Sequence, residues 1–319
     1  MKAVVYTAPL TLELQEVGAP HAGEDETIVR VGAVGICGSE LEGFASQSPF
    51  RRPPLIMGHE FAGTRVSDGA RVVVNPLVYC GHCDSCRRGS VNVCRNRVLL
   101  GIQRPGGFAE YAAVPSRNCY VLPEGTPLEA AALVEPLANA VHALRLVRET
   151  TKDVERVGII GSGMVGVAVT VVAKAAGIGH VEVVDLSPER AAVALTAGAD
   201  AVGESLEGEF DVVFDAVGTG GTRAAAVEAI RPDGTAVFIG LHSDDAGFDG
   251  RDIIRNEKRV IGSFCYTDAD FAAAVELVGH VRREWYEVRP LSEGVEAFTR
   301  LLTTVPTTIK TVLVPEEIA

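Results

Sequence analysis

The stretch VGIIGSGMVG, residues 157–166, joins an apolar run of strand type to the pattern G-x-G-x-x-G, and an uncharged helical segment follows. In this context Gly161 permits a tight turn, Gly163 lets the backbone approach a pyrophosphate, and Gly166 allows close contact between helix and strand. Met164 and Val165 complete the loop at a helix N-terminus, which attracts anions. The stretch predicts a dinucleotide-binding unit; the alternative is a plain strand-to-helix turn.

The residues around this stretch repeat the alternation of strand and helix. Near-continuous apolar strands separated by helices predict a doubly wound parallel sheet, hence an α/β domain, over about 127–289. A turn is expected at 231–234. The predicted strands are 157–160, 181–184, 212–214, 236–239 and 259–261, and the predicted helices are 165–176, 188–197, 222–230 and 270–278.

Asp185 ends the second predicted strand, 19 residues after Gly166. A carboxylate at this position accepts hydrogen bonds from the adenosine ribose and repels a 2′-phosphate, which favours NAD over NADP. Arg190 is a further candidate cofactor-binding residue, although Pro188 and Glu189 are expected to place it one turn into the next helix. Asp215, which ends a later strand, is interpreted as an acidic strand-end residue and is given no role.

Residues 1–126 have a different sequence pattern, in which short β-branched runs alternate with Gly, Pro, Asn and Asp. This pattern predicts an irregular β domain. The run Lys310–Val314 is again of β type, so about 290–319 is expected to return and complete this domain. A chain of 319 residues exceeds what one hydrophobic core usually organises, which agrees with two domains.

Four cysteines, Cys80, Cys83, Cys86 and Cys94, have the spacing C-x₂-C-x₂-C-x₇-C. Such a set predicts a closed structural zinc site; an iron–sulfur cluster is the alternative, but the last spacing is seven and Arg95 follows where proline is typical. The chain has seven cysteines, an odd number, and four of them crowd into 15 residues, so disulfides are disfavoured.

The remaining cysteines differ in what their surroundings predict. Cys37 and the pair His59 and Glu60 each lie at the end of an apolar run, and one thiolate, one imidazole and one carboxylate would leave a zinc position open to a substrate. We therefore expect a second, catalytic zinc and Lewis-acid chemistry. Cys119 and Cys265 are interpreted as small buried apolar residues.

The charge pattern limits the kinds of partner. The formal net charge is −13, and no basic run is longer than two arginines, so neither nucleic acid nor an anionic membrane is expected to bind. A small molecule is the expected partner. The first residues, MKAVVYTAPL, lack the apolar stretch of a secretory signal, and we expect a cytoplasmic protein.

Five motifs occur in a characteristic order: VGAVGICGSE (31–40), PPLIMGHEFAG (53–63), CGHCDSCRRGSVNVC (80–94), VEPLANAVHAL (134–144) and GSGMVG (161–166). Together they resemble the zinc-dependent medium-chain dehydrogenases/reductases of the alcohol dehydrogenase superfamily, in the sorbitol, butanediol and threonine dehydrogenase branch. The resemblance covers nearly the whole chain. It implies a GroES-like β domain, a Rossmann domain, an active site in the cleft between them, and a homodimer or homotetramer.

Residue by residue, the resemblance implies that Cys37 and His59 bind the catalytic zinc and that the four clustered cysteines bind the structural zinc. Glu60 and Glu135 both match positions near the catalytic metal, and either is a candidate third ligand. Ser39 matches the hydroxyl that hands on the substrate proton. Two departures are Glu40, where the family usually has Asp, and Glu42, where relatives often have a relay histidine; for Glu42 a solvated surface carboxylate is the alternative interpretation.

The implied activity is hydride transfer between a secondary alcohol, such as a diol, polyol or amino alcohol, and NAD, with the alcohol or the corresponding ketone as substrate. One alternative is an NADPH-dependent zinc reductase that acts on a ketone or aldehyde. Another is a non-catalytic NAD-binding zinc protein, against which the Cys37, His59 and Ser39 set argues.

Overall fold

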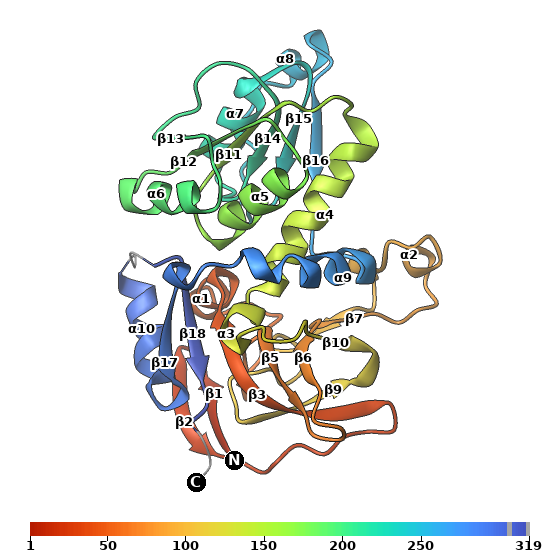
Figure 1. The fold of residues 1–319 in the computed structure, drawn as a ribbon, viewed down its shortest axis with the longest axis vertical. Helices are drawn as coiled ribbons and strands as arrows, with labels where there is room; N and C mark the ends of the chain where they lie inside the picture. Colours follow the sequence, from red (N-terminus) through yellow and green to blue (C-terminus); the bar gives the residue numbers. More distant parts are fainter. Residues whose placement is uncertain (305–307, 317–319) are drawn as a thin grey trace. The chain divides into compact units, whose positions relative to one another are not determined.

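The computed structural model describes residues 1–304 and 308–316 and divides the chain into two compact units (Figure 1). Unit 1 contains Met1–Glu135 and the described residues from Thr267 onward, and unit 2 contains Pro136–Tyr266. The sequence pattern suggested changes of domain at 126/127 and 289/290 instead. The boundaries differ because α3 packs on strands β3 and β5 of unit 1, and because Asp268 accepts hydrogen bonds from Asn75 and Tyr79.

Unit 1 is built mainly from short strands. Its elements are β1 (Lys2–Ala8), β2 (Thr11–Glu16), β3 (Glu26–Ile36), α1 (Gly38–Ala45), β4 (Leu55–Ile56), β5 (Glu60–Arg65), β6 (Arg71–Val74), β7 (Leu77–Val78), α2 (Asp84–Arg87), β8 (Val98–Leu99), β9 (Tyr111–Pro115), β10 (Cys119–Val121), α3 (Leu128–Ala131), α9 (Asp268–Glu276), β17 (Tyr286–Pro290), α10 (Gly294–Thr303) and β18 (Lys310–Val314), with short 3₁₀ turns between some of them.

The main sheet of unit 1 has the strand order β10-β6-β5-β3-β18-β17, and β9 also pairs with β3. As expected from the sequence, the chain returns at its end to this sheet, where β18 pairs antiparallel with β3. Smaller sheets, β2-β1-β4 and β7-β8, complete the irregular β architecture. The long strand β3 lies between β5 and β18, so residues from three distant parts of the sequence meet on it.

The core of unit 1 fixes helix α1. Phe44 is buried, and its ring centroid lies 5.4 Å from that of Tyr6 and 5.3 Å from that of Phe298. These aromatic contacts join α1 to β1 and α10. The N-terminal turn of α1, which carries Ser39 and Glu40, is therefore held on a packed support.

Unit 2 confirms the predicted doubly wound parallel sheet. Its strand order is β13-β12-β11-β14-β15-β16, with every adjacent pair parallel (Figure 1). The elements are α4 (Val134–Thr150), which begins at the boundary, β11 (Arg156–Ile160), α5 (Met164–Ala175), β12 (His180–Val184), α6 (Pro188–Thr196), β13 (Ala201–Gly203), β14 (Phe210–Asp215), α7 (Gly220–Ala229), β15 (Ile230–Phe238), α8 (Gly250–Arg255) and β16 (Arg259–Gly262).

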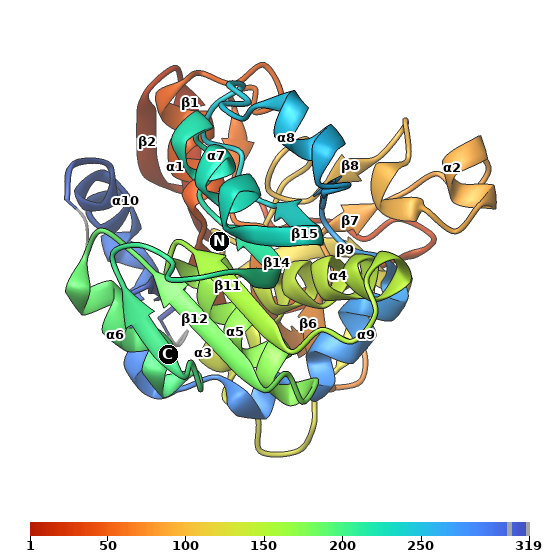
Figure 2. The same ribbon diagram turned by 90° about the horizontal axis from the view of Figure 1, so that it is seen from above.

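The order of strands in unit 2 reverses between β11 and β14. Right-handed crossovers in opposite directions place α5 and α6 on one face of the sheet and α7 on the other (Figure 2). Ligands of such sheets bind beyond the carboxyl ends of the strands at this switch point. The glycine loop follows β11 directly, so the fold puts it at this position.

Three details differ from the sequence-based expectations. The residues predicted as a turn, 231–234, belong to β15, where a register shift and a positive φ of 62° at Asp233 bend the strand. The helix predicted at 270–278 is α9, and it belongs to unit 1. The short strand β13 was not predicted, because three residues carry too little periodicity.

One helical segment, Leu128–Thr150, is long and apolar enough to cross a membrane by length and composition alone. In the structure, 78% of its most apolar window is buried inside the protein. Such burial is typical of a core helix, whose apolar surface is covered by the protein itself.

Candidate metal and cofactor sites

The first cluster of possible metal ligands forms where β3 and β5 pair. Cys37 follows the end of β3, and His59 and Glu60 lie at the start of β5, with Glu60 directly opposite Gly35. One ligand atom from each of the three lies within 4.8 Å of the others. A Cβ atom on Gly35 would lie 2.3 Å from Glu60 Oε2, so glycine makes room for this carboxylate.

Glu40 makes hydrogen bonds to the residues that form this cluster. Its side chain is fully buried, and its oxygens accept hydrogen bonds from the backbone N–H groups of Gly58 (2.8 Å) and Cys37 (3.0 Å) and lie 2.9 Å from His59 Nδ1. A proton on Nδ1 facing the carboxylate leaves Nε2 with the lone pair that a metal needs. The extra methylene of Glu40, compared with the family's usual Asp, is therefore accommodated.

Charge explains the protonation behaviour of this pair. Burial alone would raise the pKa of Glu40, but the adjacent His59 outweighs burial, and Arg51 and the Cys37 N–H add to its effect; the pKa of Glu40 is lowered. For His59, burial alone would lower the pKa, but Glu40 and Cys37 outweigh it and raise the pKa well above its usual range. The pocket thus stabilises positive charge beside Cys37.

Glu60 has a second partner that the sequence did not reveal. Lys310, from β18, places Nζ 2.6 and 2.8 Å from the two carboxylate oxygens of Glu60 and 3.3 Å from the carbonyl oxygen of Ile36. Burial alone would lower the pKa of Lys310, but the charges of Glu60, Cys37 and Glu135 outweigh it, and the pKa is raised. Both oxygens of Glu60 therefore already have a cationic partner.

Glu135 lies at the first turn of α4 and is buried. Among the residues that the structure describes, the close ligand group contains Glu60 and leaves Glu135 outside it. Glu135 is nevertheless near enough for its charge to contribute to the raised pKa of Lys310. Glu135 therefore lies near Lys310 but outside the group of Cys37, His59 and Glu60.

Ser39 lies in the first turn of α1, and its hydroxyl donates to Cys37 Sγ at 3.4 Å. Glu42, one turn further along the same helix, is exposed. The structure thus brings Ser39 to the cluster and leaves Glu42 at the surface.

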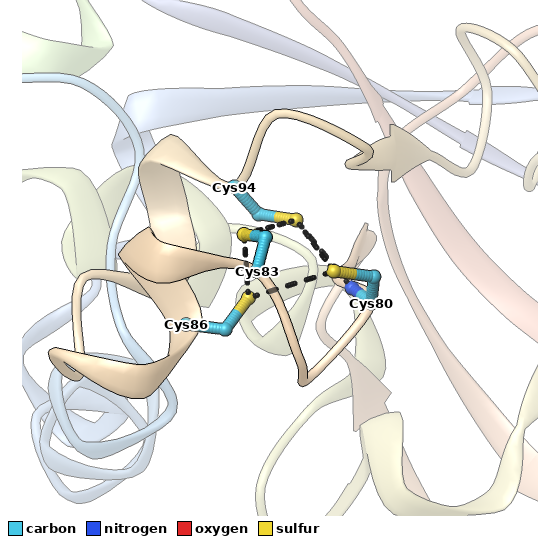
Figure 3. A group of neighbouring side chains, drawn as sticks. All are labelled: Cys80, Cys83, Cys86 and Cys94. Carbon is cyan, nitrogen blue, oxygen red and sulfur yellow. Dashed lines mark hydrogen bonds between the residues drawn. The ribbon is translucent and has the colours of Figure 1, made fainter.

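The second cluster is formed by the four cysteines around α2. Figure 3 shows the sulfur atoms of Cys80, Cys83, Cys86 and Cys94 pointing toward one another. Adjacent sulfurs are 3.5, 3.6, 3.7 and 4.0 Å apart. A tetrahedral zinc with bonds of about 2.3 Å requires sulfurs about 3.8 Å apart. The donor set and the spacing therefore fit a structural zinc ion.

The glycine loop has the shape that the sequence predicted. Gly161 has a φ of +94°, and a Cβ atom on Gly166 would lie 1.8 Å from the carbonyl oxygen of Gly161. Helix α5 begins at Met164 and has no side-chain cap at Gly163. Its first N–H groups, around the partly exposed Val165, are available to a pyrophosphate, and the loop fits a dinucleotide.

Asp185 and Arg190 both lie against this loop. Asp185 accepts hydrogen bonds from the backbone N–H groups of Ser162 (2.7 Å) and Ser187 (3.0 Å), so its carboxylate braces the loop. Arg190 has its Nη2 2.9 Å from the place that a Cβ atom of Gly163 would occupy. A carboxylate and a guanidinium thus both lie next to the glycine loop.

Sequence reasoning missed two residues that contact the first cluster or its neighbours, Lys310 and Arg51. Lys310 is a lysine inside the run KTVLV, and a charged residue in a buried strand was a signal that could have been followed. Arg51, which is buried against α1, lies in an irregular loop without periodicity, and its sequence context gave no signal.

Comparison with known proteins identifies relatives that cover most of the chain. Two family models match the chain: the alcohol dehydrogenase GroES-like domain over residues 23–124 and the zinc-binding dehydrogenase domain over residues 165–280. L-galactonate-5-dehydrogenase of Escherichia coli (strain K12) is 31% identical over 301 residues, which is 87% of each chain. L-threonine 3-dehydrogenase of Pyrococcus abyssi is 34% identical over 281 residues, 80% of each chain.

Solved structures show the same architecture. An alcohol dehydrogenase of Escherichia coli CFT073, solved with NADH, has a TM-score of 0.90 at 25% identity and covers 98% of this chain and 99% of its own. A protein described as a zinc-binding dehydrogenase of Sinorhizobium meliloti 1021, solved with NADP, has a TM-score of 0.90 at 29% identity with the same coverage. For 2R,3R-butanediol dehydrogenase of Bacillus subtilis the TM-score is 0.87 at 26% identity, with 99% of each chain covered.

These matches agree with the ordered motifs, with the folds of the two units and with the two ligand clusters. The chain therefore belongs to the zinc-dependent medium-chain dehydrogenases/reductases of the alcohol dehydrogenase superfamily.

Proposed function

We propose that this protein is an NAD-dependent zinc dehydrogenase that interconverts a secondary alcohol and its ketone. The observation that carries the proposal is the cluster of Cys37 and His59 beside the hydroxyl of Ser39, with Glu40 fixing the histidine from behind. A bound zinc would supply Lewis-acid polarisation of the substrate oxygen, and the nicotinamide would accept the hydride.

The roles of the chain's own residues follow from their contacts. Cys37 and His59 would hold the metal, with Glu60 or Glu135 as the third protein ligand. Because Lys310 already engages both oxygens of Glu60, Glu60 would have to exchange this partner before it could bind the metal.

Ser39 would move the proton. In alcohol oxidation its oxygen would accept the proton of the substrate hydroxyl, and its own proton would pass on toward solvent; in ketone reduction the direction would be reversed. Glu42, which is exposed on α1, would be a bystander in this transfer.

Preference for NAD is supported by the position of Asp185 at the end of β12, since a carboxylate there repels a 2′-phosphate. Arg190 beside Gly163 favours the second candidate, an NADPH-dependent ketone reductase, because a guanidinium can accept such a phosphate. We give NAD precedence, because a carboxylate directly after the second strand is the position that selects for the ribose hydroxyls in dinucleotide-binding folds.

The substrate class is inferred from the relatives. They are named for L-galactonate, L-threonine and 2R,3R-butanediol, and each of these molecules carries a secondary hydroxyl next to another polar group. We infer a polyol, vicinal diol or amino alcohol as substrate.

We also propose that the protein is a homodimer or homotetramer and that neither nucleic acid nor a membrane is its partner. We further propose that it is cytoplasmic, because its seven free thiols suit a reducing compartment.

A substrate panel tests the proposal. Zinc-loaded protein should reduce NAD⁺ in the presence of at least one diol, polyol, sugar acid or amino alcohol, and reduce NADP⁺ more slowly. A Cys37→Ser variant is the matched control, because it removes one metal ligand with little change in volume. Oxidation of no alcohol in the panel, or equal rates for Cys37→Ser and the wild type, would show that the site is not catalytic.

A further inference from the structure

Arg51 is a buried cation next to the cluster of Cys37 and His59. It is 7% exposed, and its Nη2 donates a hydrogen bond to Ser39 Oγ at 3.3 Å. Buried arginines are rare unless they are paired, so a buried guanidinium beside a hydroxyl of the site requires an explanation.

The chain makes a specific space for this side chain. Ser39 and Gly43 are one turn apart on α1 and share a face of the helix. A Cβ atom on Gly43 would lie only 2.4 Å from Arg51 Nη1 and 3.1 Å from its Cζ. The guanidinium therefore lies against the backbone of α1, and glycine at 43 is what permits this approach.

The chemistry of the guanidinium limits what Arg51 can do to Ser39. Arginine has only donors and stays protonated, so it can neither accept nor supply the proton of the reaction. Its hydrogen bond occupies one lone pair of Ser39 Oγ. The O–H bond of Ser39 must then point away from Arg51, and in the structure it donates toward Cys37 Sγ.

From this geometry we propose that Arg51 is a positioning residue: it turns the hydroxyl of Ser39 toward Cys37, at the Cys37 and His59 cluster. The proposal rests on the proposed function, in which Ser39 carries the proton. It also accounts for the glycine at position 43, because a larger residue would displace the guanidinium.

A double-mutant cycle tests the proposal with the most active alcohol of the substrate panel and NAD⁺. Arg51→Met should lower kcat about 10- to 150-fold, as expected for the loss of a hydrogen bond to a charged group, with a smaller change in KM. Ser39→Ala should lower kcat by ~10²–10⁴-fold. If Arg51 acts through Ser39, adding Arg51→Met to Ser39→Ala should change kcat less than about twofold.

Arg52→Met is the matched control, because the neighbouring arginine is exposed and bonds only the carbonyl oxygen of Pro49 among the described residues. Its kcat should be that of the wild type. Zinc content and circular dichroism should be unchanged in all variants, since the role is local. Should Arg51→Met fail to fold, the same cycle with Arg51→Lys keeps the buried charge, and kcat should again be coupled to Ser39.

The outcomes distinguish a failure of the positioning role of Arg51 from a failure of the proposed function. If Arg51→Met lowered kcat by the same factor in the wild-type protein and in the Ser39→Ala variant, the positioning role would be overturned while the proposed function stayed intact. A wild-type kcat for Arg51→Met would do the same. A nearly normal Ser39→Ala enzyme would instead remove the proton-transfer step of the proposed function, and the role of Arg51 with it.

Discussion

Replacing Lys310 by methionine would remove the cation from a deeply buried ion pair at the site. The side chains of Lys310 and Glu60 are 4% and 1% exposed, and Nζ lies 2.6 Å from the nearer carboxylate oxygen. Methionine keeps much of the length and apolar surface of lysine but removes the charge. The variant therefore leaves the carboxylate of Glu60 buried in unit 1 without its cation.

The loss in the free energy of unfolding that Lys310→Met should cause can be estimated from the geometry of the ion pair. At an effective dielectric of about 20, two unit charges at this separation attract each other by about 6 kcal/mol, and the desolvation of both groups opposes this gain. Removal of one partner of a buried pair typically costs about 3–5 kcal/mol, because the remaining charge stays uncompensated. We expect Lys310→Met to destabilise metal-free unit 1 by that amount. With zinc loaded, the loss should be smaller, because the metal's charge lies beside the same carboxylate.

The chain contains a convenient probe for this measurement. Trp285 is the sole tryptophan, it is fully buried in unit 1, and it precedes β17, the strand that pairs with β18. Its fluorescence during urea unfolding therefore reports on the unit that contains Lys310. Lys2→Met, an exposed lysine of the same unit, is the control and should change the free energy of unfolding by less than about 0.5 kcal/mol.

The double variant Glu60→Gln with Lys310→Met removes both charges and should recover most of the lost stability. The reasoning would be refuted if Lys310→Met cost less than about 1 kcal/mol in metal-free protein, or if the double variant were less stable than the single one. Either result would mean that the pair is not the compensated buried ion pair that the distances indicate.

Three further outcomes are expected. Cys80→Ser should remove one equivalent of zinc and lower the midpoint of thermal unfolding, because a closed thiolate site contributes folding energy; an unchanged zinc content by mass spectrometry would contradict the four-sulfur assignment. Asp185→Gly should weaken NAD⁺ binding about 10- to 150-fold and affect NADP⁺ less, as measured by titration of both cofactors; equal losses for both would instead indicate only the bracing of the loop. Burial raises the pKa of Cys119 to about 11, so iodoacetamide should alkylate it slowly near neutral pH and faster as the pH approaches that value, as followed by peptide mass spectrometry; rapid labelling at neutral pH would contradict this environment.

Features encoded over short distances in the chain were predictable from sequence. The glycine loop and the four-cysteine cluster each lie within about one turn or loop, and their spacing alone limits the backbone geometry. The parallel sheet of unit 2 was predictable because its apolar strands and helices alternate regularly. The position of α9 in unit 1 was not, since it depends on the side-chain contacts of Asp268 with Asn75 and Tyr79.

The partners of the candidate site were beyond sequence reasoning for a related reason. Lys310 and Glu60 are 250 positions apart, and they meet only because β18 and β5 flank β3. Arg51 reaches Ser39 from an irregular loop, where no periodic pattern predicts the direction of a side chain. Such contacts come from tertiary structure, whereas Cys37 and His59 were found through a resemblance of motifs.

Metal analysis combined with an activity assay is the most direct test of whether Cys37 and His59 hold a catalytic zinc ion. Protein purified without chelator should contain two zinc ions per chain. Brief chelation should remove one of them together with alcohol oxidation, without loss of Trp285 fluorescence intensity or wavelength, and added zinc should restore both the metal and the activity. A fully active preparation with one zinc per chain, or activity that survives loss of the chelatable ion, would contradict a catalytic metal held by Cys37 and His59.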